Sequence, residues 1–545
     1  MDTARQDPGG RATPGQAPAG PVSAGQAPAG QPAAGETPAG QAGPGEVPAG
    51  QARPVREQPD QGPTWAAPQA DGPLRARLRV PGSKSMTNRA LVLAALAAGP
   101  TDILNPLRAR DTLLMAGALR ALGATVDTQA PEDTGTMRPN GTTDGETTAW
   151  RVSPGWTAGD ARVDVGNAGT VMRFVPPVAA LASVATEFHG DARASQRPVG
   201  AIISALRELG AVIDDGGRGA IPFTVHGKGS LAGGAVTVDA SASSQLVSGL
   251  LLAAPRYDKG LEVRHRGGRA PSAPHIEMTV QMLRDAGATV ETATLLTATG
   301  QTATGQTATG QTAAGQTATG QTAAGQTTAS QSGRDVLPDT WYVHPGVLGT
   351  HPITVQPDVV NSMPFLAAAM VTGGTVTILG WPAVTTQPAA HILRVLREMG
   401  ADAALGPDGL TVTGPPTLRG VTADLADCSE ISMVLGALAA LASSPSVLTG
   451  IGHQRHQETD RLAALATEIN ALGGDVIERA DGLEIRPRPL RASRPFATYD
   501  DHRLVMAAAI LGLVVPRLEV ENVATVGKTF PAFTSAWAAM LERAP

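Results

Sequence analysis

Cysteine is almost absent from this sequence, since Cys428 is the only one in 545 residues. A lone cysteine excludes an intramolecular disulfide and any zinc site built from several cysteines. Aromatic residues make up only 3% of the chain, whereas alanine and glycine are abundant. The sequence therefore predicts a protein whose cores are built from small, closely packed side chains.

Long apolar runs and a large excess of positive charge are also missing. No apolar stretch approaches the roughly 20 residues that cross a bilayer, and the N-terminus lacks the charged start and apolar core of a secretory signal. The formal net charge is −6, which argues against general nucleic-acid binding. We expect a cytoplasmic protein with neither a membrane nor a nucleic-acid partner.

Three segments have low complexity and are not expected to carry chemistry. Residues 1–70 repeat a Gly-Gln-Ala-Pro-Ala-Gly pattern, which cannot bury enough apolar surface to offset its ordering entropy. A Gln/Thr/Ala/Gly repeat fills residues 292–333, and a polar insertion fills about 129–148. We expect a disordered tail and two surface-loop expansions, which are tolerated because loop-closure cost grows slowly with length.

The rest of the chain has an internal repeat in which an amphipathic helix ends at a glycine and a short β-like run follows. Each glycine suits a left-handed residue at the end of a helix. A second, more apolar helix lies upstream of each one, entered from a strand. We expect six strand–helix–strand–helix units in two globules of three, an α/β fold. The glycines that mark the repeat are Gly123, Gly210, Gly287, Gly400 and Gly473.

Polar residues gather where strands lead into helices. A helix N-terminus presents free N–H groups and partial positive charge, so it attracts phosphate and carboxylate groups. The first three junctions hold Lys84, Ser85 and Arg89; then Asn167, Gly169, Thr170 and Arg173; then Ser243, Ser244 and Gln245.

More basic residues occupy later junctions. Arginine forks suit phosphate and carboxylate, and lysine supplies a compact charge. Each of these residues alone would more often be a surface ion pair, but their recurrence in a net-acidic protein predicts small substrates with several negative charges. The later basic residues are Arg197, Arg461, Arg503 and Lys528.

Taken together, these motifs resemble the 5-enolpyruvylshikimate-3-phosphate synthase family, in an actinobacterial-like form, from about Leu74 onward. The strongest matches are Pro81-Gly-Ser-Lys-Ser-Met-Thr-Asn-Arg89 and Gly166-Asn-Ala-Gly-Thr-Val-Met-Arg173, supported by Glu458-Thr-Asp-Arg461, Asp501-His-Arg503 and Lys528-Thr-Phe-Pro531. The resemblance implies a two-domain inside-out α/β barrel, the enolpyruvate transferase fold, with six βαβαββ units. One domain would span residues 83–355, and the other would combine residues 71–82 with 356–545.

The resemblance also implies two substrates, shikimate 3-phosphate and phosphoenolpyruvate. Shikimate 3-phosphate would contact Lys84, Ser85, Arg89, Ser243, Ser244, Gln245, Ser272, Glu430 and Gln457, with His275 near its phosphate. Phosphoenolpyruvate would contact Lys84, Asn167, Gly169, Thr170, Arg197, Gln245, Arg461, Arg503 and Lys528.

The implied reaction transfers the enolpyruvyl group to the 5-hydroxyl of shikimate 3-phosphate and releases phosphate, a step of the shikimate pathway toward chorismate and aromatic amino acids. It needs no metal or cofactor, and the family is usually monomeric. Glu430 would deprotonate the 5-hydroxyl and Glu458 would help move the proton at C3. Lys84 and Lys528 would share protons or stabilise charge.

Two positions depart from the family pattern. Many members have Asp where Glu430 stands, and Lys is usual where this chain has Gln457. Glutamine can hydrogen-bond a hydroxyl but carries no charge, so we expect weaker substrate binding or a shifted pH profile. Phosphoenolpyruvate and its mimic glyphosate should lie against the backbone of Gly169.

Two alternatives remain open from the sequence. The sister enolpyruvyl transferase that acts on UDP-N-acetylglucosamine usually has a cysteine in a mobile loop of its first half, whereas Cys428 lies in the second half here. A catalytically silent binding protein with the same fold would account for Gln457.

Overall fold

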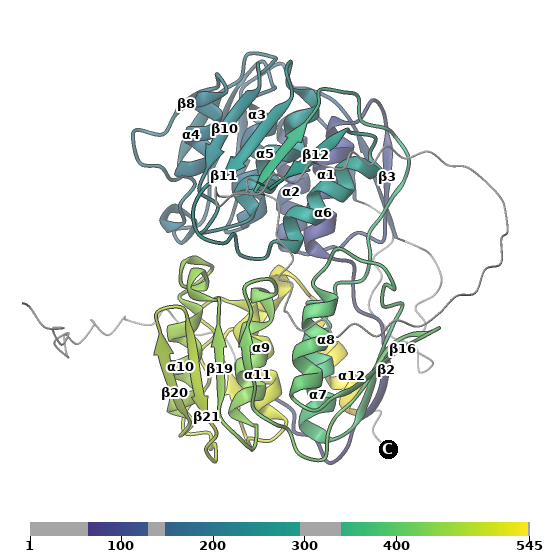
Figure 1. Ribbon diagram of the computed structural model, residues 1–545, viewed down its shortest axis with the longest axis vertical. Coiled ribbons are helices and arrows are strands. Elements are labelled where there is room, and N and C mark those ends of the chain that lie inside the picture. The colour runs from purple at the N-terminus through teal and green to yellow at the C-terminus, as the bar shows by residue number, and fades with distance from the viewer. Residues whose placement is uncertain (1–63, 129–147, 295–338, 543–545) are drawn as a thin grey trace, which may run out of the picture. The chain divides into compact units, whose positions relative to one another are not determined.

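The computed structural model of the chain describes residues 64–128, 148–294 and 339–542 (Figure 1). These residues belong to one compact unit that contains two separate hydrophobic cores. Within the described ranges, no helix is long and apolar enough to span a membrane. The expected low-complexity segments lie almost entirely outside these ranges.

The first core is enclosed by three four-stranded sheets. Each sheet has two parallel strands at one side and an antiparallel hairpin at the other. The strand orders are β14-β3-β5-β4, β6-β7-β9-β8 and β10-β11-β13-β12. The strands are β3 (Thr101–Leu104), β4 (Thr125–Asp127), β5 (Ala149–Ser153), β6 (Ala161–Asp164), β7 (Ala185–His189), β8 (Val212–Asp214), β9 (Phe223–His226), β10 (Gly234–Val238), β11 (Leu261–His265), β12 (Val290–Ala293), β13 (Thr340–Val343) and β14 (Ile353–Thr354).

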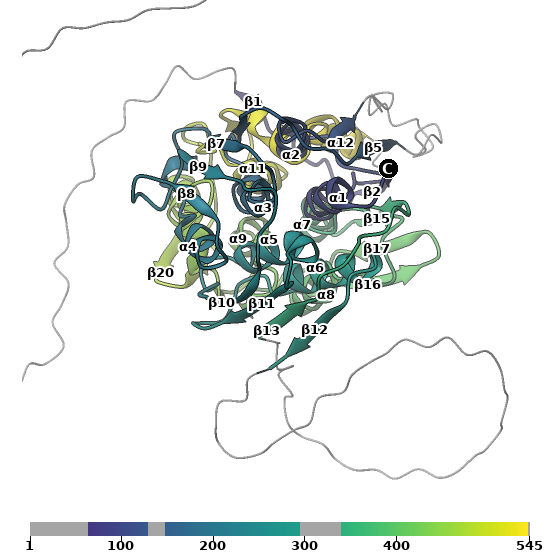
Figure 2. The same ribbon diagram turned by 90° about the horizontal axis from the view of Figure 1, so that it is seen from above.

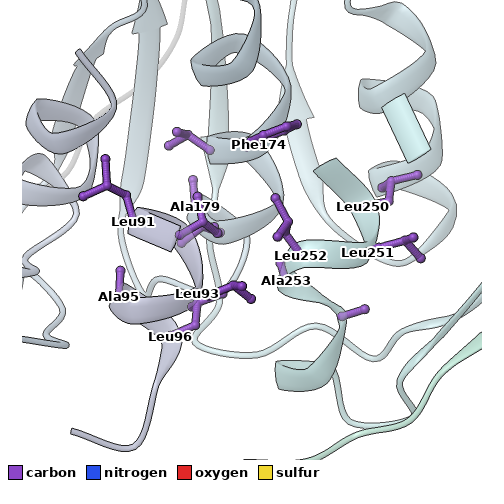
Figure 3. Close-up of a cluster of buried hydrophobic side chains, with 14 of the residues drawn as sticks. Leu91, Leu93, Ala95, Leu96, Phe174, Ala179, Leu250, Leu251, Leu252 and Ala253 are labelled. Carbon is purple, nitrogen blue, oxygen red and sulfur yellow. The ribbon is translucent and has the colours of Figure 1, made fainter. Parts of the chain in front are cut away.

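Three apolar helices fill the space inside these sheets, namely α1 (Lys84–Leu96), α3 (Gly169–Ala179) and α5 (Gln245–Ala253). Figure 2 shows them at the centre with the strands around them. Leu91, Phe174 and Leu250, one from each helix, are fully buried and lie in one apolar cluster (Figure 3). Because these helices are apolar on all sides, only their N-terminal ends carry polar residues toward a site.

The amphipathic helices of the repeat are α2 (Arg110–Ala121), α4 (Gly200–Glu208) and α6 (Pro274–Asp285) in the first half. In the second half they are α8 (Ala389–Glu398) and α10 (Arg461–Ala471). All five marker glycines follow these helices with φ between 92° and 110°, so the expected positive-φ helix ends are confirmed. This conformation is costly for a residue with a Cβ.

The second core repeats the arrangement around the apolar helices α7 (Met363–Thr372), α9 (Ser432–Ala440) and α11 (His502–Gly512). Two four-stranded sheets have the orders β16-β17-β15-β2 and β18-β19-β21-β20. The strands are β2 (Arg75–Leu78), β15 (Thr375–Leu379), β16 (Asp402–Gly406), β17 (Gly409–Thr413), β18 (Thr422–Asp424), β19 (Ser446–Thr449), β20 (Asp475–Arg479) and β21 (Gly482–Arg486). The last helix is α12 (Phe533–Glu542).

Two strands are exchanged between the halves. β2 precedes α1 in sequence but pairs in parallel with β15 of the second half. β14 leads into α7 of the second half in sequence but pairs in parallel with β3 of the first half. The chain therefore crosses between the cores twice, near Gly82 and near Val355, and we propose these crossings as the domain limits.

The sixth unit differs from the expectation. No strand forms at Ala497–Tyr499, where Phe496 makes only an isolated parallel bridge to Val520. Tyr499 and Asp500 have φ of 52° and 58°, a left-handed turn that ends extended backbone. The sixth sheet is the two-stranded pair of β22 (Glu519–Val520) and β1 (Trp65–Ala66).

The strand β1 also corrects the expected boundary of the N-terminal tail at residue 70. Trp65 and Ala66 pair antiparallel with β22, and Ala67 belongs to the second core. Apolar residues at 65–67 interrupt the Pro/Gly pattern and supply the surface that this pairing buries. The expected insertions at 292–333 and 129–148 fall mainly on residues outside the described ranges.

Candidate active site

The start of α1 places a lysine where the two halves meet. Ser83 caps this helix by accepting a hydrogen bond from the backbone N–H of Met86. The backbone N–H of Lys84 donates to Asp358 across the chain crossing, at 3.1 Å. The Lys84 ammonium lies 3.4 Å from the buried carboxylate of Asp111. Lys84 is therefore held by both halves.

Arg89 lies one turn further along α1 and is 1% exposed. Its guanidinium donates to the hydroxyls of Thr279 and Ser248 and to the carbonyl of His275, at 2.7, 3.1 and 2.9 Å. It also lies over the ring of Phe174. Burial lowers the pKa of Arg89, but the group is still a cation at neutral pH. The result is a fixed positive charge in the pocket wall.

The start of α3 gathers two arginines around a glycine. Arg197 donates from Nη1 to both the carbonyl and the side-chain oxygen of Asn167, each at 2.8 Å. Arg173 donates to the carbonyl of Gly169 at 3.2 Å and to Oε1 of Gln245 at 3.3 Å. Both guanidiniums are at least 95% buried. Gly169 thus lies beneath two cations and beside the start of α5.

Hydroxyl and amide groups come from α1, α3 and the start of α5. Thr170 accepts a hydrogen bond from the amide of Asn88 at 2.7 Å. Ser243 accepts one from the backbone N–H of Gln245 at 3.3 Å, and Ser244 is buried beside them. These groups provide uncharged donors and acceptors, which suit hydroxyls and phosphate oxygens.

Glu430 comes from the second half and meets residues of the first half. Its Oε1 accepts a hydrogen bond from Ser272 at 2.8 Å and lies 3.3 Å from Nδ1 of His275. Its Oε2 is buried without a partner among the described residues. Burial raises the pKa of this carboxyl, but His275, the Ser272 hydrogen bond and the charge of Arg503 outweigh it, so the pKa lies below its usual value. Glu430 is ionised at neutral pH with one oxygen free to accept a proton.

Glu458 is the second buried carboxylate. Its two oxygens accept hydrogen bonds from Lys528 and Arg461, each at 2.8 Å. Burial opposes ionisation, but the charges of Arg461 and Lys528 hold the pKa of Glu458 well below its usual value. Lys528 also donates to the carbonyl of Asn167 at 3.0 Å. The ammonium therefore joins Glu458 to the start of α3.

The start of α11 orients the arginines of the second half. Asp501 caps this helix by accepting from the backbone N–H of Arg503 at 2.9 Å and also accepts from Nε of Arg461 at 2.7 Å. Neither ring nitrogen of His502 has a hydrogen-bond partner among the described residues. Burial and the charge of Arg503 hold the pKa of His502 well below its usual value, so its ring is neutral.

One pocket collects most of the residues expected from the sequence. It combines side chains from the starts of α1, α3, α5, α10 and α11 with the loop residues before α6 and α9. Asn167 and Lys528 are outside its lining and adjoin it through Arg197 and Glu458. The expected residues that line the pocket are Lys84, Ser85, Arg89, Gly169, Thr170, Arg197, Ser243, Ser244, Gln245, Ser272, Glu430, Gln457, Glu458, Arg461 and Arg503.

Several lining residues were not among the expected site residues. His502 lies inside a recognised motif, so it could have been inferred. His453 contacts Ser429 at 3.0 Å, and Gln454 accepts from Arg461 at 2.7 Å. Both lie in a 3₁₀ turn, Gly452–His456, whose sequence has no periodic signal. Asp111 lies in the first turn of α2, where an acidic residue is common and so gives no functional signal.

Metal-binding and thiol chemistry find little support in the side chains. Within residues 64–128, 148–294 and 339–542, no group of three or more His, Cys, Asp or Glu side chains is arranged to hold a metal ion. Cys428 is buried and unpaired. Burial and the charge of Glu430 raise the pKa of its thiol to about 12, so it is not a nucleophile at neutral pH.

Comparison with known proteins gives the sequence and fold relationships of the chain. The chain is 46% identical over 483 residues to a 3-phosphoshikimate 1-carboxyvinyltransferase of Kocuria rhizophila, covering 88% of this chain and 97% of the relative. Two solved structures of EPSP synthase from Acinetobacter baumannii superpose with TM-scores of 0.64 and 0.63. Each is 22% identical and covers 97% of its own chain and 88% or 87% of this one.

The structural likeness confirms the expected two-domain α/β fold of the enolpyruvate transferases. The profile of the family described as EPSP synthase (3-phosphoshikimate 1-carboxyvinyltransferase) matches residues 68–309 and 333–537. The break in the match coincides with most of the Gln/Thr/Ala/Gly repeat. By sequence, fold and the residues of its pocket, this chain belongs to the EPSP synthase family.

Proposed function

We propose that this protein transfers the enolpyruvyl group of phosphoenolpyruvate to the 5-hydroxyl of shikimate 3-phosphate. The proposal rests on one observation: two ionised carboxylates, Glu430 and Glu458, line the same pocket as several lysine and arginine side chains at helix starts. A polyanionic substrate pair needs the cations, and two proton movements need the carboxylates.

The cationic end of the pocket is the proposed site for phosphoenolpyruvate. Arg197 approaches it from the first half, whereas Arg461 and Arg503 approach it from the second. The backbone of Gly169 borders the same space. Phosphate and carboxylate groups are recognised well by guanidinium forks and helix N-termini. The further proposed contacts are Lys84, Asn167, Thr170, Gln245 and Lys528.

The hydroxyl-rich side is the proposed site for shikimate 3-phosphate. Ser85 and the cation Arg89 lie along α1, and Ser272 lies beside Glu430. A phosphorylated sugar-like ring needs both a cation for its phosphate and neutral partners for its hydroxyls. The remaining proposed contacts are Lys84, Ser243, Ser244, Gln245, Glu430 and Gln457.

Glu430 is the proposed base. Its Oε1 is occupied by Ser272 and His275, which leaves Oε2 as the acceptor for the proton of the 5-hydroxyl. The carboxylate is already ionised at neutral pH, as a base must be before it acts. The resulting 5-oxygen attacks C2 of phosphoenolpyruvate after C3 has taken up a proton.

Glu458 and Lys528 are proposed to handle the proton at C3. Lys528 donates a hydrogen bond to Glu458 at 2.8 Å, so the pair can deliver a proton and later receive one. Addition gives a tetrahedral intermediate. Loss of phosphate from C2 and of a proton from C3 then restores the double bond and gives the enol ether product. Lys84 and the arginines stabilise the charge on the departing phosphate.

The test is phosphate release from phosphoenolpyruvate with each acceptor. Purified protein should release phosphate with shikimate 3-phosphate and not with UDP-N-acetylglucosamine. Release only with the nucleotide sugar would assign the sister reaction. Binding of shikimate 3-phosphate without turnover would indicate the silent binding protein.

We further propose that the protein is a monomer and that it lies in the cytoplasm, as the family resemblance implies. Sedimentation of the purified full-length chain, with and without both substrates, tests the monomer. Fractionation of the producing cells tests the location.

A further inference from the structure

The segment between β7 and α4 carries a second arginine that the proposed reaction leaves unused. Arg193 begins a short 3₁₀ turn, Ala194–Gln196, that ends at the buried Arg197. Arg193 is half-buried and is absent from the pocket lining. Its guanidinium nevertheless makes three hydrogen bonds, two of which reach the opposite half of the molecule.

Those two hydrogen bonds end on backbone carbonyls of consecutive residues, Gln457 and Glu458. Nε of Arg193 donates to the carbonyl of Glu458 at 3.0 Å, and Nη2 donates to the carbonyl of Gln457 at 3.3 Å. Nη1 donates to Gln196 of its own turn at 2.8 Å, which fixes the plane of the guanidinium. A planar fork on two consecutive carbonyls determines both the position and the orientation of a peptide segment.

The same segment also reaches Glu458 by a second route. Arg197 donates to the carbonyl of Asn167 at 2.8 Å, and that carbonyl accepts from Lys528 at 3.0 Å. Lys528 in turn donates to the carboxylate of Glu458 at 2.8 Å. Arg193 holds the backbone of Glu458, and Arg197 holds the carbonyl that positions Lys528, the partner of the Glu458 carboxylate. Residues 193–197 therefore position both the backbone and the side chain of Glu458.

We propose that Arg193 is a positioning residue that sets the Gln457–Glu458 backbone from across the pocket, so that the Glu458 carboxylate meets Lys528 in the reactive geometry. This inference rests on the proposed function. A misplacement of about 1 Å can cost about 100-fold in rate when proton transfer depends on geometry. Arg193 does not line the pocket, so the role proposed for it is indirect.

The test compares Arg193→Ala with Arg193→Lys, Gln196→Ala and the control Arg162→Ala. Arg162 lies on the same half and pairs with exposed Glu187. Arg193→Ala should lower kcat by about 10-fold or more, the value of one or two charge-assisted hydrogen bonds. Its KM for shikimate 3-phosphate should change less than 3-fold, roughly. Arg193→Lys, with one donor group in place of a fork, should recover only part of the loss.

We expect Arg162→Ala to have the kinetic constants of the wild type. The kcat of Gln196→Ala should lie between those of Arg162→Ala and Arg193→Ala. Equal kcat in Arg193→Ala and wild type would overturn the inference. So would full recovery by lysine, since charge alone would then suffice. Melting temperature separates a folding defect from a positioning defect, because a half-buried arginine outside both cores should leave it nearly unchanged.

Hydrogen exchange provides a readout that needs no turnover. In Arg193→Ala, the peptide covering residues 452–461 should exchange faster than in wild type, whereas Arg162→Ala should leave it unchanged. If the wild type shows no phosphate release, the proposed function fails and exchange alone decides the inference. Unchanged exchange in that peptide would then overturn it.

Discussion

Lys528 and Glu458 form a buried ion pair in which the ammonium nitrogen lies 2.8 Å from Oε1 of the carboxylate. Arg461 holds Oε2 at the same distance. Both charged groups of the pair have side chains less than 10% exposed. A carboxylate between two cations resists protonation, so Glu458 is ionised in the resting enzyme. The proposed proton relay depends on this arrangement.

Replacement of either member should disable the relay. We expect Glu458→Gln and Lys528→Met each to lower kcat by about 100-fold or more, the usual worth of a positioned acid or base. The double variant should cost little beyond either single variant, because the two groups act as a unit. Additive losses in steady-state kinetics would contradict the pairing. The exposed pair Arg77–Asp408 offers a matched control.

Glu430→Gln should lower kcat by about 100-fold or more, since the amide cannot accept the proton, whereas Glu430→Asp should retain most activity.

The pKa of Glu430 is lowered in the folded protein, so the ionised form is the active and the stabilising one. Both contributions are present at neutral pH and are lost as the pH falls through the lowered folded pKa. An acidic limb of the wild-type pH–rate profile that is assigned to Glu430 and lies above the usual range of a glutamate carboxyl would refute this.

Gly169→Ala should weaken phosphoenolpyruvate binding. An added Cβ would lie 2.7 Å from Nη2 of Arg197 and 3.0 Å from Nη1 of Arg173. Both are ends of flexible side chains, so the protein should fold while the guanidiniums move. We expect the KM for phosphoenolpyruvate and the inhibition constant of glyphosate to rise by about 10-fold, the worth of one displaced charged contact. Gly117→Ala, where a Cβ would have open space, is the control; equal constants in both variants would exclude this placement.

Gln457→Lys should strengthen binding of shikimate 3-phosphate. Gln457 lines the pocket, and its side chain makes no hydrogen bond within the described part of the chain. A lysine there would add a positive charge beside the anionic substrate. We expect a lower KM or a shifted pH optimum for the variant. His456→Lys, one residue away and exposed, controls for charge alone. No change in KM or pH optimum would remove Gln457 from the substrate site.

Glu468→Gln should destabilise the second half. This carboxylate is 1% exposed and accepts hydrogen bonds from both terminal nitrogens of Arg494 and from the hydroxyl of Tyr499. We expect a loss of about 2–3 kcal/mol in urea unfolding, because charge-assisted bonds are lost in a buried setting. Glu398→Gln, which breaks only the exposed pair with Arg394, should cost less than about 0.5 kcal/mol. Similar losses in both would contradict the buried network.

Local chemistry explains why much of the fold was predictable. A positive-φ glycine after an amphipathic helix is a local requirement, and Gly210 has both features. Apolar helices such as α3 can also be predicted, because their sequences are runs of apolar residues. The strand expected at Ala497–Tyr499 failed because Tyr499 adopts a left-handed turn, where its hydroxyl bonds Glu468. That tertiary contact leaves no pattern in the neighbouring sequence.

The candidate site also combines residues with a local sequence signal and residues that only tertiary contacts bring in. Lys84, Gly169 and Arg461 belong to motifs at helix starts, so their chemistry could be inferred from sequence. The contact of Lys528 with Asn167 joins residues 361 positions apart, and only the fold brings them together. His453 had no motif, and its place in the pocket follows from a 3₁₀ turn that the surrounding contacts determine.

The strand exchange between the halves bears on the order in which the protein can be assembled on the ribosome. Leu78 of β2 pairs with Ile378 of β15, and Trp65 of β1 pairs with Val520 of β22. At about 5–20 residues per second, β2 emerges roughly 15–60 s before its partner is made. The residues of the first core can gather meanwhile around their own helices. The earliest strands to be synthesised are thus among the last to find their places, and the nascent chain must keep them free of other partners during that interval.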